Sequence, residues 1–117
     1  HDMVAFHTFE GITIHAEEGP RVLASIGNRQ AVILRNHGLL SWGQTLPQAL
    51  AILWTLQRAC EIQLATQSMG EPLPVPERIA AQCTRDALQF DPRHGAGQDV
   101  FDALVRQVDR IDESYKT

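Results

Sequence analysis

Two short apolar runs near residues 31–43 predict a β-hairpin. The first run, AVIL, is continuous over the length of a strand, which is typical of a strand covered on both faces. The second run, LLSW, returns as the partner strand. Between them, Asn36, His37 and Gly38 supply turn chemistry, because glycine adopts positive φ without strain and asparagine often does. The hairpin would leave His37 as the functional group at its tip.

Beyond the hairpin, apolar residues recur at helical spacing. Thr45 can cap the clearest helix, Gln48 can complete a T-x-x-Q capping box, and Pro47 stands in the first turn. Shorter segments on both sides show the same helical period. The pattern predicts helices near residues 17–26, 45–69, 76–89 and 98–112.

Strands therefore occupy the first third of the chain and helices the rest, which predicts an α/β fold with helices packed on a sheet. The segment GITIH at 11–15 alternates well enough for a further short strand. A hairpin and one short strand form a small sheet whose two apolar faces both need cover. Trp54 and Ile62 widen the apolar surface of the long helix. We therefore expect an incomplete fold, which buries these surfaces against a further part of the protein, a second copy, or both.

Composition and charge exclude several classes of protein. The chain has 117 residues, which suits one domain, and a formal net charge of −4 without a cluster of basic residues, which argues against a nucleic-acid partner. The longest apolar stretch is far shorter than the roughly 20 residues of a membrane helix, and the start lacks the features of a signal peptide. Cys60 and Cys83 make no disulfide framework, so we expect a reduced, cytoplasmic setting.

His37 is the sharpest candidate for chemistry. A turn at the end of a strand can aim a neutral imidazole into a cleft, where its lone pair can bind a metal. The alternative is a turn histidine that hydrogen-bonds to the backbone. A catalytic zinc needs about three protein ligands. The other histidines stand at none of the spacings typical of metal ligands, so spacing alone builds no metal site; they are His1, His7, His15 and His94.

The remaining candidate groups have simpler structural explanations. Carboxylates could act as acids or bases but suit solvated faces or helix N-termini. Cysteines on helical stretches suit a role as small buried apolar groups. A tyrosine near the end could donate a proton but stands in a segment that usually frays. These groups are Glu17, Glu18 and Glu61, then Cys60 and Cys83, then Tyr115.

The stretch RNHGLLSWG, followed by PQALAILWTLQRACEIQ, resembles the class II aldolase/adducin superfamily, and its spelling is closest to the adducin-like bacterial branch. FEGITIHAEEG upstream and FDALVRQVDRIDESY at the end are similar to the same branch. The resemblance implies an α/β/α sandwich around a mostly antiparallel sheet. It also implies a divalent ion, usually zinc, held by two histidines of an H-x-H pair and by the histidine of an N/H-H-G turn, which is His37 here.

The chain departs from the family pattern in two ways. It has no H-x-H pair, and it lacks the upstream segment that supplies the family's acid/base glutamate. We therefore expect residues 1–117 to be the C-terminal part of a class II aldolase/adducin-like domain whose N-terminal part is absent. The start at His1 instead of methionine agrees with this expectation.

The resemblance leaves two functions open. The first is a metal-dependent class II aldolase-like enzyme that cleaves or epimerises a sugar-phosphate-like carbonyl substrate, and that is inactive as this chain alone. The second is a non-catalytic, adducin-like domain for self-association. A homo-oligomer is expected in both cases. An unrelated soluble α/β domain is the third alternative, which the absence of the hairpin over 31–43 would support.

Overall fold

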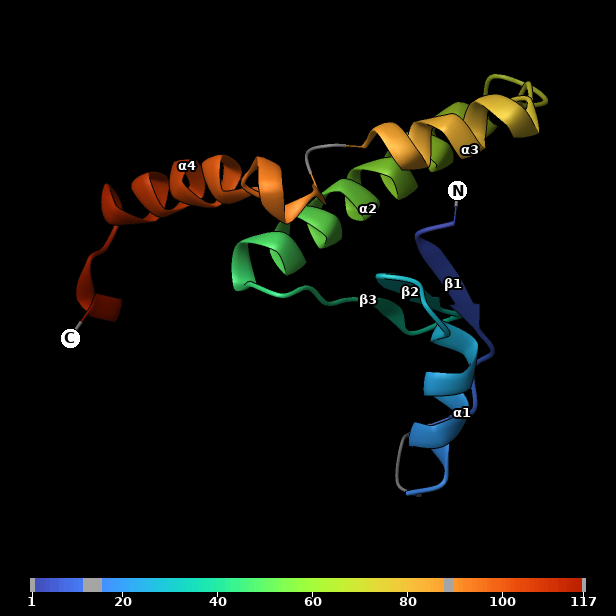
Figure 1. The fold of residues 1–117 in the computed structure, drawn as a ribbon, viewed down its shortest axis with the longest axis horizontal. Coiled ribbons are helices and arrows are strands. Elements are labelled where there is room, and N and C mark those ends of the chain that lie inside the picture. Colours follow the sequence, from blue (N-terminus) through green and yellow to red (C-terminus); the bar gives the residue numbers. More distant parts are fainter. Residues whose placement is uncertain (1, 12–15, 88–89, 117) are drawn as a thin grey trace.

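The computed structural model describes residues 2–11, 16–87 and 90–116, which form a small sheet, four α-helices and two 3₁₀ turns (Figure 1). The chain order is β1 (Val4–His7), α1 (Glu18–Ile26), β2 (Ala31–Leu34), β3 (Gly38–Ser41), α2 (Leu46–Gln67), α3 (Glu77–Asp86), η2 (Pro92–His94), α4 (Gln98–Asp109) and η3 (Ser114–Lys116). All four predicted helices are present, each within a few residues of its predicted bounds.

The predicted hairpin is confirmed. Strands β2 and β3 are antiparallel, with Ala31 opposite Ser41 and Leu34 opposite Gly38. The continuous apolar run of β2 is explained by its central position in the strand order β1-β2-β3, where it is covered on both faces. Ala31 and Val32 are completely buried.

The third strand, β1, adds a parallel pairing to the predicted antiparallel hairpin. It pairs with β2 in parallel, so that the described sheet is mixed. The reason is the connection, because α1 crosses from the end of β1 back to the start of β2, as parallel strands require. The strand predicted over 11–15 lies outside the described residues except for Gly11, which is in a bend.

Helices cover both faces of the sheet. On one face, Ala5 and Val32 form a buried cluster with Ile26 of α1. On the other face, the Ser41 hydroxyl donates a hydrogen bond of 2.8 Å to the Ala49 carbonyl of α2. Side chains alternate between the faces along each strand. The arrangement is therefore α1, sheet, α2, which confirms the predicted partial α/β/α sandwich.

The start of α2 is fixed by Thr45 and Gln48, with one difference from the predicted capping box. Thr45 Oγ1 accepts a hydrogen bond from the Gln48 backbone N–H, as predicted. The Gln48 side chain, however, reaches one residue further back and accepts from the Gln44 N–H at 2.7 Å. Its amide nitrogen donates to the Phe90 carbonyl at 2.9 Å. Gln48 is only 2% exposed, so this one side chain joins the loop before α2 to the segment before α4.

The molecule is open, and much apolar surface stays uncovered. Its radius of gyration is 16.7 Å, against the roughly 13 Å expected of a compact domain of this length. Trp54, Ile62 and Leu64 on α2 are 49%, 63% and 68% exposed. Among the described residues, no helix has both the length and the apolar composition needed to cross a membrane.

Candidate functional site

The hairpin tip consists of Arg35, Asn36 and His37. The His37 backbone N–H donates to the Leu34 carbonyl at 3.0 Å and closes the turn. Asn36 takes the left-handed position, with φ of 56°, where asparagine is among the few side chains that fit at small cost. Gly38 is already the first residue of β3, opposite Leu34. The turn therefore depends on Asn36, whereas Gly38 belongs to the strand that follows.

His37 is exposed and lines a cavity of about 340 Å³ between α1 and the sheet. This is the concave surface expected of it, and its ring is not among the core residues. We call this space the hairpin cavity. Its wall also contains His7 from β1, Glu18 from α1 and Arg35 from the turn. Its apolar side chains are Phe9, Val22, Leu23, Ile26, Leu34 and Leu40.

His7 was not predicted to take part in the site, yet it is buried in the same wall. It is 7% exposed, and its Nδ1 lies 2.9 Å from Ser25 Oγ of α1. A serine hydroxyl has a single proton, and Ser25 donates it to the Arg21 carbonyl. His7 Nδ1 must then be the donor to Ser25. In the neutral ring, Nε2 consequently has a free lone pair.

His7 Nε2 is buried and has no hydrogen-bond partner among the described residues. The nearest carboxylate oxygen, Glu10 Oε1, is 3.7 Å away, which is too far for a hydrogen bond. Glu10 is instead paired with Arg21, whose Nε donates to both carboxylate oxygens at 3.1 and 2.8 Å. The hydrogen bond from Arg21 lowers the pKa of Glu10. An unpaired buried acceptor of this kind is uncommon and marks a functional candidate.

The other sequence candidates lie apart from the hairpin cavity. Glu61 on α2 binds Arg58 at 2.6 Å. Tyr115 donates to Asp109 Oδ1 at 2.5 Å, which raises the pKa of the tyrosine and holds its proton at the end of α4. Cys60 is half-buried, whereas Cys83 is exposed, which corrects its predicted burial. No residue of α3, the helix that contains Cys83, is buried.

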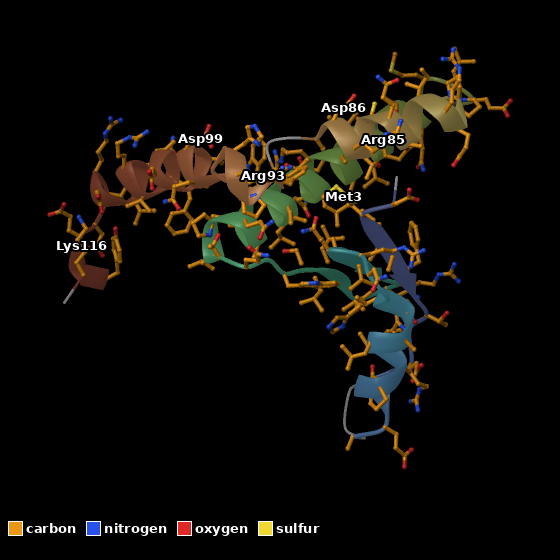
Figure 2. All side chains as sticks on the ribbon, in the orientation of Figure 1. Met3, Arg85, Asp86, Arg93, Asp99 and Lys116 are labelled. Carbon is orange, nitrogen blue, oxygen red and sulfur yellow. The ribbon has the colours of Figure 1, made fainter. Side chains whose placement is uncertain are left out.

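A second hollow, of about 350 Å³, lies where α3 and η2 approach the start of β1. Figure 2 labels Met3, Arg85 and Arg93, which line it from three segments. Arg93 binds Asp91 at 2.6 Å, and its hydrogen bonds lower the pKa of Asp91 to about 2. These charges already neutralise each other, so this hollow is a weaker candidate than the hairpin cavity.

A zinc site would need several ligand side chains close together. No group of three or more His, Cys, Asp and Glu side chains in the described ranges could hold a metal. His94 lies on η2, near Asp91, and His1 and His15 are outside the description. Since catalytic zinc needs about three protein ligands, the described residues do not fit a complete zinc site. An exposed imidazole such as that of His37 fits the role of one ligand.

Comparison with known proteins agrees with this geometry. The family model of the Class II Aldolase and Adducin N-terminal domain matches residues 2–64, which include the whole sheet, α1 and the first part of α2. The chain belongs to the class II aldolase and adducin family. The family resemblance of the hairpin sequence is thereby confirmed.

Relatives in this family match nearly the whole chain. A protein of Pseudomonas aeruginosa named as a candidate class 2 aldolase is 35% identical over 97% of this chain and 45% of its own length. Alpha-adducin of Rattus norvegicus is 32% identical over 97% of this chain and 17% of its own length. A crystal structure of an aldolase II superfamily protein from Pseudomonas syringae matches with a TM-score of 0.86 and 33% identity, covering 98% of this chain and 46% of the other. The chain thus spans less than half the length of these relatives.

Proposed function

We propose that residues 1–117 are the C-terminal part of a class II aldolase-like domain. The complete protein would be a metal-dependent enzyme that cleaves or epimerises a small carbonyl compound, with His37 as one zinc ligand. The placement of His37 is the observation that carries this proposal. It is an exposed imidazole on the tip of a two-stranded turn, it lines a cavity, and it is the histidine of the N-H-G sequence.

The contribution of this chain to such a site would be to hold His37 in place. The backbone hydrogen bond from His37 to Leu34 and the left-handed Asn36 fix the turn, while the paired strands hold the turn against the rest of the sheet. A bound divalent ion would supply polarisation of a carbonyl oxygen and would stabilise the negative charge that develops on it. The other ligands and a catalytic base would be residues outside this chain. We therefore expect the 117-residue chain alone to show no turnover.

A non-catalytic interaction domain is the second candidate function. Two observations favour it: the chain aligns with alpha-adducin over nearly its full length, and large apolar side chains remain exposed on α2. In that case the same scaffold would serve self-association, and His37 would have no metal to bind.

The zinc content of His37→Ala in the full-length protein tests the proposal. We expect about one zinc per wild-type chain, and a loss of at least about 100-fold in zinc affinity for His37→Ala, because one of about three ligands is removed. His94→Ala is the matched control, since His94 is also exposed but lies on η2. Elemental analysis after dialysis against a weak chelator measures the metal. Equal zinc in His37→Ala and wild type, or a wild-type protein without zinc, would contradict the metal function and favour the interaction domain.

A further inference from the structure

The wall of the hairpin cavity is apolar over most of its surface. Six of its side chains are aliphatic or aromatic, from the segment after β1, from α1 and from both hairpin strands. The hydroxyl groups of a sugar would lose their hydrogen bonds to water against such a wall. An aromatic ring has no such hydrogen bonds to lose and packs favourably on apolar side chains. The volume of about 340 Å³ is at the lower end of small-molecule sites, so it suits a compound with one ring.

One cation in this wall has no counter-ion among the residues that the structure describes. Arg35, in the turn beside His37, makes no ion pair with any described residue, although its backbone N–H is bonded to His7 O at 3.0 Å. The planar guanidinium is suited to a carboxylate, which it can bind with two parallel hydrogen bonds. Glu18 is the acidic residue of the wall and would repel an anion, so we expect the carboxylate at the Arg35 side.

The buried nitrogen of His7 supplies a third and independent element. Its Nε2 lone pair has no donor within the described residues, and a ligand hydroxyl would provide one. The ring is held by one hydrogen bond, to Ser25, and His7 is part of the cavity wall. A ligand hydroxyl that reaches Nε2 from the cavity would therefore give this acceptor its partner.

We propose that the hairpin cavity binds an aromatic carboxylate that bears a ring hydroxyl. Arg35 binds the carboxylate, the apolar wall holds the ring, and His7 Nε2 accepts a hydrogen bond from the ring hydroxyl. This inference rests on the proposed function, because it names the class of its substrate and replaces the sugar-phosphate class that the family resemblance implied. His7 thereby becomes a specificity-determining residue of this site.

Calorimetric titration of the full-length protein with two probes tests the inference. The probes are 3-(4-hydroxyphenyl)propionate and 3-phenylpropionate, which differ by one hydroxyl and contain no carbonyl group other than the carboxylate. The titration is done after removal of metal with a chelator, so that binding does not depend on zinc. The wild-type protein should bind the hydroxylated probe about 10-fold more tightly, the effect of one good hydrogen bond to a buried acceptor.

Three variants separate the two polar contacts. In His7→Phe, the preference for the hydroxylated probe should disappear, while binding of 3-phenylpropionate should change by less than about twofold. In Arg35→Gln, both probes should bind about 10-fold more weakly, because the charge-assisted contact is lost. Arg29→Gln, a change at another exposed arginine outside the cavity wall, should leave both affinities unchanged.

Because His7 is buried, the His7→Phe variant could fail to fold. A second measurement, on the wild-type protein, tests the same contact without a substitution. The ¹⁵N resonance of His7 Nε2 should shift on addition of the hydroxylated probe and stay in place with 3-phenylpropionate. Equal affinity for the two probes, an unshifted Nε2 resonance, or no binding of either probe at millimolar concentration would overturn the inference. None of these results bears on zinc content, which tests the proposed function separately.

Discussion

The Gln48 side chain joins two segments that are far apart in the sequence. It is almost completely buried, it accepts from the Gln44 N–H, and it donates to the Phe90 carbonyl 42 positions along the chain. Both partners are backbone groups in part-buried hydrogen bonds, so removal of the side chain leaves one donor and one acceptor without this partner. Each such hydrogen bond contributes about 0.5–1.5 kcal/mol to stability.

Gln48→Ala in the full-length protein should therefore lower the free energy of unfolding by about 1–3 kcal/mol. Gln57→Ala on the same helix is the control, since Gln57 bonds only to the exposed side chain of Glu61, and it should change stability by less than about 0.5 kcal/mol. Urea denaturation followed by circular dichroism measures both. A Gln48→Ala variant as stable as the control would show that these two hydrogen bonds are replaced by water.

At the residue scale, His37 could be predicted and His7 could not. The turn at His37 is local, because the apolar runs and the residues Asn36 and Gly38 that define it are neighbours in sequence. Burial of His7 results from pairing of β1 with β2 and from Ser25 on α1, which are 18 or more positions away. The four residues Val4–His7 are too few to distinguish a strand by period alone, and the buried ones are Ala5 and His7 while Phe6 is exposed, the reverse of what hydropathy predicts.

At the scale of elements, the contact between α2 and α4 depends on one glycine. Gly97 caps α4 with a left-handed φ of 81°. A Cβ atom built there would lie 2.3 Å from Ala51 Cβ, far inside contact distance. The two helices can approach closely only because this position has no side chain.

Gly97→Ala should destabilise the protein by about 3 kcal/mol, the sum of backbone strain and overpacking against Ala51. Gly95→Ala isolates the backbone part, because Gly95 has a similar φ of 84° and no atom within 4 Å of a built Cβ. We expect about 1 kcal/mol for that variant. Thermal denaturation of both gives the difference, and equal melting temperatures for the two would mean that α4 does not pack against α2 at this point.

The helices were predictable because their signals are local, whereas the sheet was only partly so. Thr45 and Pro47 mark the start of α2 within the sequence itself, and the apolar period sets its length. The parallel pairing of β1 depends on how α1 packs on the sheet, which no short segment encodes. The T-x-x-Q pattern likewise identified the helix start but not the reach of Gln48 to Gln44 and Phe90.

At the scale of the whole molecule, the described residues bury too little apolar surface for a self-sufficient domain. The fully or nearly buried apolar residues are few and mostly small, among them Ala5, Ala31, Val32 and Ala51. Large apolar side chains on α2 and α4 stay exposed, and Phe6 on the edge strand β1 is 75% exposed. Exposed apolar area of this kind is typical of an interface with another part of the protein or another copy.

The 117-residue chain expressed alone should accordingly self-associate and bind a hydrophobic dye. Sedimentation velocity and fluorescence of 8-anilinonaphthalene-1-sulfonate measure these two properties. The full-length protein is the control and should bind much less dye per chain. A stable monomer of the 117-residue chain that binds no dye would show that the exposed faces need no cover.

Anomalous X-ray diffraction from crystals of the full-length protein, at the zinc absorption edge, tests the central claim most directly, because it locates the ion. The claim that His37 is a zinc ligand predicts an anomalous peak about 2.1 Å from a His37 ring nitrogen, at the mouth of the hairpin cavity. A zinc-loaded crystal whose peaks all lie beyond coordination distance of His37 would contradict it.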